Sequence, residues 1–89
     1  VMDGISAAMT NEMDFKNGAA PQTNYDTYPL LRMRAAPKVD VHFIQSDVAP
    51  TGLGEPALPP IAPAIANAIF AATGERIREM PFSKSGYSV

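Results

Sequence analysis

A run without charged residues, from Pro56 to Gly74, constrains this chain more than any other feature. Pro59 or Pro60 can begin a helix there, because proline lacks an amide hydrogen and the first-turn amides of a helix have no intrahelical partner. Even Pro63 fits within that first turn. Gly74 suits the position just after a helix, where the left-handed conformation is common. We therefore expect a helix that begins near Pro59 or Pro60 and ends at Gly74.

This predicted helix is apolar on every side, with Asn67 as the only polar residue in its middle. A surface helix of a small domain normally carries a charged outer face. One broad aliphatic face consists of Leu58, Ile61, Ile65, Ala66, Ile69 and Ala72. The opposite side consists of Ala62, Ala64, Ala68 and Phe70. The rest of a chain of 89 residues is too short to cover such a helix. We therefore expect a piece of a larger protein, or association through this helix.

Composition excludes several classes of function. The uncharged run is about as long as a membrane span, but its prolines interrupt the start of the helix, and we expect no membrane span. Seven basic and nine acidic residues give a net charge of −2 without a basic stripe, which argues against a nucleic-acid partner. The chain has no cysteine, so disulfides, cysteine zinc sites and cysteine-ligated iron–sulfur clusters are excluded within it. No signal peptide pattern is visible.

The remaining segments predict strands and one further helix. Ile5, Met9 and Met13 have helical spacing, and Asp3 suits the N-cap. Asn17-Gly18 is typical of a tight hairpin turn. Alternation predicts strands at 39–46 and 76–80, on either side of the apolar helix. The predicted fold class is therefore α+β, with a short helix and β-hairpin followed by a β-α-β unit.

Glu55 is the acid most suggestive of chemistry. Gly52 and Gly54 allow tight backbone geometry around it and let another molecule approach the main chain. A carboxylate desolvated at the mouth of an apolar helix becomes a stronger base. Alternatively, Glu55 complements the dipole of the helix that follows. The local pattern alone favours the dipole interpretation, because acids near helix starts are common.

Other polar residues give weaker signals. His42 has no second histidine or acid cluster at ligand spacing, and an exposed or structurally satisfied strand histidine is the more common case. Ser46 and Ser83 have no histidine arranged to activate them. The scattered acids are typical of solvated turns and caps. They are Asp14, Asp26, Asp40 and Asp47. We predict no metal ligand in the chain.

The turn and helix together carry a family resemblance. The matching blocks are GLGEP at 52–56, LPPIAPAIANAIFAATG at 58–74 and RIR at 76–78, with NY at 24–25 and YPLLRM at 28–33 upstream. These blocks resemble the C-terminal end of the large subunit in the molybdenum hydroxylase family, which includes xanthine oxidase and aldehyde oxidoreductase. The resemblance is to its bacterial isoquinoline 1-oxidoreductase and aldehyde dehydrogenase-type subunits, and it covers nearly the whole chain.

The resemblance implies roles for the turn. In that family the glutamate of this turn is the active-site base beside molybdenum, and it takes a proton from the water-derived nucleophile that attacks an electron-poor carbon. Glu55 would be that base, and Gly52, Leu53 and Gly54 would contact the pterin cofactor. Residues 1–82 would be the C-terminal part of a molybdopterin-binding domain and 83–89 a tail. The rest of the subunit and an iron–sulfur subunit or domain would be partners.

The same resemblance limits what the chain does alone. The earlier cofactor-binding segments of the family are missing from it, so we expect no bound cofactor and no turnover in isolation. Aldehydes and N-heteroaromatic compounds are both candidate substrates, and both the bacterial cytoplasm and the periplasm stay open as compartments. The alternative is a non-catalytic truncated or structural module that self-associates through its apolar helix.

Overall fold

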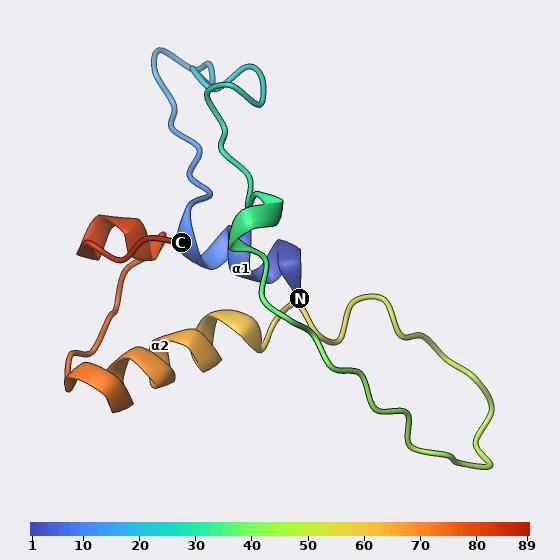
Figure 1. The fold of residues 1–89 in the computed structure, drawn as a ribbon. Helices are drawn as coiled ribbons and strands as arrows, with labels where there is room; N and C mark the ends of the chain where they lie inside the picture. Colours follow the sequence, from blue (N-terminus) through green and yellow to red (C-terminus); the bar gives the residue numbers. More distant parts are fainter.

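The computed structural model describes all residues, 1–89, as helices joined by long irregular segments (Figure 1). In chain order the elements are α1 (Met2–Met9), the 3-10 helix η1 (Met33–Ala35), α2 (Ile61–Thr73) and the 3-10 helix η2 (Phe82–Ser85). α1 packs against both α2 and η2. Two long loops, at 10–32 and 36–60, extend away from these helices in different directions (Figure 1).

α2 confirms the helix expected in the uncharged run. Pro60 is its N-cap and Pro63 lies in its first turn. Gly74 follows the helix in the left-handed conformation, with φ of 77°, and its amide donates a hydrogen bond of 2.7 Å to the Phe70 carbonyl. The helix ends there because glycine adopts positive φ without the steric cost of a Cβ atom. Both ends of α2 are therefore set by the backbone properties of proline and glycine, which can be identified from the sequence.

α1 begins earlier than its sequence signals predict. Val1 is the N-cap and no side chain caps the helix, so the prediction of Asp3 as N-cap is wrong. Asp3 lies instead in the first turn, where its negative charge favours the helix dipole. The helix ends at Met9, and Met13 lies outside it with an exposed side chain.

The predicted α+β fold is wrong, because the structure contains no strand and no sheet. Asn17 and Gly18 do form the expected turn, with φ of 51° and 79°. Lys16 and Ala19 exchange backbone hydrogen bonds of 2.8 and 3.0 Å across it. Pairing stops at this single bridge. An isolated hairpin is marginal in water, and neither flank here has a core to pack against.

The predicted β-α-β unit is also absent. Segments 39–46 and 76–80 flank α2 as expected, but neither is a strand. In the first, Val41, Phe43 and Ile44 are exposed, and Ile44 reaches 93%. Alternating residues define two faces only when a partner strand supplies hydrogen bonds and a core covers one face. Within this chain neither condition is met.

The core is thin and lies where α1, α2 and η2 meet. Its buried hydrophobic residues are Ala8, Met9 and Phe82. Half-buried side chains pack around them, namely Ile5, Ala62, Ile65, Ala66, Ile69, Ile77 and Tyr87. α2 contributes no fully buried residue. One side of this helix therefore packs on the core, while Ala64, Ala68 and Phe70 on its other sides are exposed.

The exposed surface is large for a chain of this mass. The accessible area is 7230 Å², whereas a compact protein of 9.5 kDa exposes about 5,000 Å². The radius of gyration is 16.1 Å, against about 12 Å for a compact domain of this length. Neither α1 nor α2 is long enough and apolar enough to cross a bilayer.

Candidate functional site

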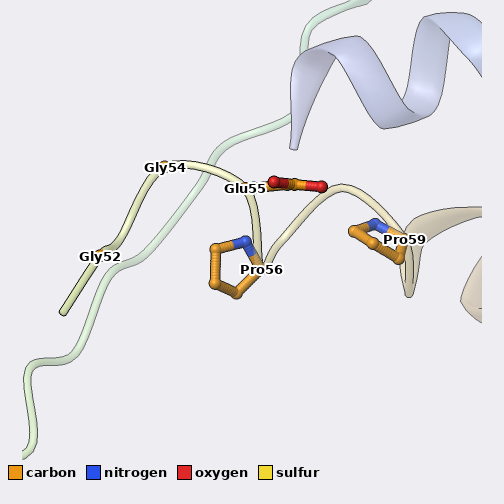
Figure 2. A pocket seen from close by; sticks show the side chains of 5 residues that line it. All are labelled: Gly52, Gly54, Glu55, Pro56 and Pro59. Carbon is orange, nitrogen blue, oxygen red and sulfur yellow. The ribbon is translucent and has the colours of Figure 1, made fainter.

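An open hollow of about 350 Å³ lies just before α2 (Figure 2). It is lined by Gly52, Gly54, Glu55, Pro56 and Pro59. A Cβ atom built on either glycine would meet no heavy atom within 4 Å. Neither glycine has a positive φ, and the first hydrogen-bonded turn of the segment runs from Glu55 to Leu58. The main chain of residues 52–55, which lead into it, is therefore open to close approach by another group.

Local hydrogen bonds tie Glu55 to the start of α2. The Leu58 amide donates to the Glu55 carbonyl at 2.9 Å, and the Ile61 amide donates to the Leu58 carbonyl at 3.3 Å. The helical ladder then begins, with Ala64 donating to Pro60 at 3.1 Å. Successive turns thus connect the acid to the helix, so the position of α2 determines the position of Glu55.

The Glu55 side chain has no structural partner within the chain. Its carboxylate is exposed and takes part in none of the side-chain hydrogen bonds or ion pairs of the molecule. It also lies outside the first turn of α2, which contains no acid, and Pro60 occupies the N-cap position. Helix-dipole effects fall off within that first turn. The dipole interpretation of Glu55 is therefore not supported by the geometry.

The predicted cofactor-contacting residues share one exposed segment but not one hollow. Gly52 and Gly54 line the hollow together with Glu55, whereas Leu53 is 82% exposed and lines the neighbouring hollow with Phe43 and Ile44. The amides of Gly52, Leu53 and Gly54 donate no hydrogen bond within the chain. The desolvation expected around Glu55 is absent here, because its side chain is exposed.

Other candidate residues lie apart from this turn. His42 is exposed on the loop between η1 and α2. No group of three or more His, Asp and Glu side chains is arranged to hold a metal ion. Sequence reasoning missed Pro56 and Pro59 as lining residues and Gly4 as a contact of the α2 start. The available signal for Gly4 was a glycine inside a helical pattern, which often has a packing reason.

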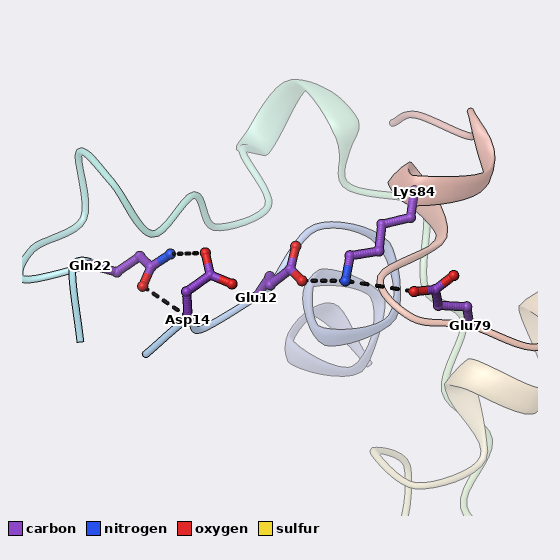
Figure 3. A network of polar contacts seen from close by, with 5 residues as sticks. All are labelled: Glu12, Asp14, Gln22, Glu79 and Lys84. Carbon is purple, nitrogen blue, oxygen red and sulfur yellow. Dashed lines mark hydrogen bonds and ion pairs between the residues drawn. The ribbon is translucent and has the colours of Figure 1, made fainter. Parts of the chain in front are cut away.

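A separate polar cluster holds the C-terminal segment in place (Figure 3). Lys84 forms ion pairs with Glu12, beyond the end of α1, and with Glu79 at 3.8 Å. Next to it, the Gln22 amide and Asp14 bond each other across the turn at 17–18, at 2.9 and 3.0 Å. Hydrogen bonding to Glu12 raises the pKa of Lys84 above its ordinary value. This cluster stabilises the packing of η2 and does not include the turn of Glu55.

Comparison with known proteins identifies the family to which this chain belongs. No family model matches the chain. The chain is 41% identical over 78 residues to a "membrane-bound aldehyde dehydrogenase [pyrroloquinoline-quinone]" of Gluconacetobacter polyoxogenes. It is 33% identical over 81 residues to the "isoquinoline 1-oxidoreductase subunit beta" of Brevundimonas diminuta. It is 34% identical over 87 residues to the "xanthine dehydrogenase molybdenum-binding subunit" of Escherichia coli O157:H7.

These matches cover 88%, 91% and 90% of the chain, respectively. The chain belongs to the molybdenum hydroxylase family. It spans only 10% of the length of the first two relatives and 12% of the third. The family resemblance inferred from the GLGEP turn and the apolar helix is thereby confirmed.

Proposed function

We propose that this chain is the C-terminal segment of a molybdenum-cofactor oxidoreductase subunit that oxidises or hydroxylates aldehydes or N-heteroaromatic compounds. Residues 1–82 form the C-terminal part of the molybdopterin-binding domain, and 83–89 form a tail. The observation that carries the proposal is the Glu55 carboxylate, which stands on an open glycine turn without a structural partner. Its relatives are oxidoreductase subunits of the same family.

Glu55 acts as the general base in this proposal. A general base must come within hydrogen-bond reach of the proton that it removes. The Glu55 carboxylate is free to make such a contact, because no ion pair or hydrogen bond within the chain occupies it. It would accept the proton of the water-derived nucleophile. Once the rest of the subunit covers the turn, exclusion of water would strengthen Glu55 as a base.

The turn also fits a pterin cofactor. Space around Gly52 and Gly54 permits close approach to the main chain, and three successive amides of the turn are without acceptors. Such amides suit the carbonyl and phosphate oxygens of a ligand. Gly52, Leu53 and Gly54 would hold the cofactor through these main-chain groups. When bound, the cofactor supplies the two-electron redox chemistry that no side chain of this segment provides.

The names of two relatives of this chain mention different cofactors. The xanthine dehydrogenase relative is named as a molybdenum-binding subunit, whereas the aldehyde dehydrogenase relative is named with pyrroloquinoline quinone. We propose molybdenum because the family as a whole and the glycine–glutamate turn favour it. Metal analysis of the purified full-length subunit distinguishes the two, since only the molybdenum enzyme contains that metal in proportion to protein.

The partners follow from the exposed apolar surface. The side of α2 that faces away from the core is apolar except for Asn67, which accepts a hydrogen bond from the Arg76 guanidinium that lies over the Phe70 ring. The loop before it exposes Phe43, Ile44 and Leu53. We propose that the remainder of the subunit covers these surfaces. An iron–sulfur subunit or domain would then accept the electrons, because this chain has no cysteine to hold a cluster.

Replacement of Glu55 tests the proposed function. In the full-length subunit, Glu55→Gln keeps the shape of the side chain and removes its basicity. Because general-base catalysis contributes about 100-fold to 10,000-fold, we expect turnover to fall at least about 100-fold with unchanged molybdenum content. Asp47→Asn is the matched control, because Asp47 is an exposed acid of the same loop. Turnover of Glu55→Gln near the wild-type level would refute the role.

The exposed side of α2 also favours a second candidate, a non-catalytic module that associates through this helix. Ala64, Ala68 and Phe70 are exposed there. This alternative predicts that the free chain forms a concentration-dependent oligomer and that Glu55→Gln has little effect in any assay. Analytical ultracentrifugation of the chain, alone and with Ala68→Glu, separates it from the first proposal.

A further inference from the structure

Gly4 lies where α1 meets the start of α2. It is buried, and it is the only glycine of the chain that has close neighbours. A Cβ atom built on Gly4 would lie 2.9 Å from both Cβ and Cγ1 of Ile61 and 3.0 Å from the carbonyl oxygen of Leu58. Carbon atoms in ordinary van der Waals contact stay about 3.5–4.0 Å apart. The backbones therefore approach as closely as they do because residue 4 has no side chain.

The atoms that Gly4 contacts belong to the turns that carry Glu55. The Leu58 carbonyl accepts a hydrogen bond from the Ile61 amide, and the Leu58 amide donates to the Glu55 carbonyl at 2.9 Å. Two of the three nearest atoms, the Ile61 Cβ and the Leu58 oxygen, are fixed by the backbone. No rotation of a side chain can move them away. Additional volume at position 4 must therefore displace the turns themselves.

We infer that Gly4 is a positioning residue for the Glu55 base: its contact with Leu58 and Ile61 sets the placement of the turn relative to the core. The inference rests on the proposed function. Figure 2 shows α1 beside the turn that carries Glu55, and Figure 1 shows the start of α1 next to the segment leading into α2. α1 is thus the element against which the turn is located.

The low helix propensity of glycine indicates that Gly4 has a packing role within α1. Glycine is less favourable than alanine inside a helix, and Gly4 lies inside α1. Without the contact to α2, replacement by alanine would strengthen α1. The structure instead predicts that the same replacement disturbs a site more than fifty positions away in the sequence.

The test uses the full-length subunit with Gly4→Ala. Ala7→Ser is the matched control, because Ala7 is an exposed residue of the same helix. The first measurement is hydrogen exchange of the Leu58 and Ile61 amides, the two hydrogen-bonded amides between residues 55 and 61. We expect exchange at least about 10-fold faster in Gly4→Ala and unchanged in the control, since the hydrogen-bonded turns are displaced. Unchanged exchange in Gly4→Ala would overturn the inference.

The second measurement is turnover per bound molybdenum. A misplacement of about 1 Å can cost about 100-fold in rate, so we expect kcat per molybdenum to fall about 10-fold to 100-fold while KM changes little. A purely structural role predicts less loaded enzyme with unchanged kcat per molybdenum, and this result would also overturn the inference. If Glu55→Gln proves active, the proposed function fails, whereas the exchange measurement still decides whether Gly4 positions the turn.

A compensating variant tests the inference if the Gly4→Ala protein cannot be obtained in folded form. Ile61→Gly removes the two Ile61 side-chain atoms nearest to position 4. We expect the double variant Gly4→Ala/Ile61→Gly to be recovered in higher yield than Gly4→Ala. We also expect its amides at positions 58 and 61 to be as well protected from hydrogen exchange as those of Ile61→Gly alone. A double variant that is no better than Gly4→Ala in both respects would count against the contact.

Discussion

Lys84 is held between two carboxylates at the point where η2 packs against the end of α1 (Figure 3). Its hydrogen bond with Glu12 is the largest cause of its raised pKa, and the charges of Glu12, Glu79 and Asp14 act in the same direction. Near it, the Tyr87 hydroxyl donates to Glu75 at 2.7 Å, which raises the pKa of that tyrosine. The Lys84–Glu12 and Tyr87–Glu75 contacts both lie at the exposed surface, so each contribution to stability is small and sensitive to salt.

The sign of the pH dependence follows from these raised pKa values. A lysine whose pKa is higher in the folded state stabilises that state fully below its unfolded value, which is ordinarily 10.5. This stabilisation is lost as the pH rises through the folded value. We expect Lys84→Met to lower the melting temperature of the full-length subunit slightly at about pH 8, and the difference to shrink by about pH 12. A difference that grows with pH would contradict this assignment.

At the scale of elements, Ser6 connects α1 to the loop that follows it. Its hydroxyl oxygen accepts the Leu31 amide at 3.0 Å, and only 4% of the residue is exposed. Thr10, at the end of α1, donates to the Pro29 carbonyl nearby. These bonds hold the segment before η1 against α1, although the two are far apart in the sequence.

Replacement of Ser6 tests this connection. Ser6→Ala leaves the Leu31 amide without its acceptor in a part-buried place, which typically costs about 1–3 kcal/mol. We expect faster hydrogen exchange at Leu31 and a loss of stability of that order in the full-length subunit. Ser83→Ala, at an exposed position in η2, is the control. Equal behaviour of the two variants would show that the Ser6 bond does not hold the loop.

Elements also show how far the sequence determines this fold. α2 and the Asn17-Gly18 turn were predictable, because proline, glycine and asparagine act through their own backbone geometry. The strands were wrongly predicted, because the alternating pattern that includes Val41 and Phe43 forms a strand only when a partner strand supplies hydrogen bonds. The turn with Gly52, Gly54 and Glu55 was found from local spacing. Gly4 was not, because its contact with Ile61 joins distant parts of the chain.

On the scale of the whole molecule, the exposed area exceeds that of a compact protein by roughly 2,000 Å². Obligate interfaces between proteins bury areas of this order. A core of Ala8, Met9 and Phe82 supplies few fully buried contacts. The chain thus resembles one side of an interface more closely than an independent domain.

Thermal unfolding of the isolated chain tests this conclusion. Because so little apolar surface is buried, we expect a broad circular-dichroism transition with a small heat-capacity change, and no oxidation of aldehydes or N-heterocycles by the chain alone. In the full-length subunit, the amides of α2 should exchange far more slowly than in the isolated chain. A sharp two-state transition of the isolated chain would contradict the expectation.

The long loop between η1 and α2 has an entropic consequence for the proposed cofactor site. Each residue confined to one backbone conformation costs about 1–2 kcal/mol, and the exposed residues of this loop make almost no contacts that offset that cost. Whatever first orders the loop, the surrounding subunit or the cofactor, lowers the cost for the other. Under the proposed function, assembly of the subunit and loading of its cofactor are therefore linked equilibria, and each raises the affinity of the other by the same factor.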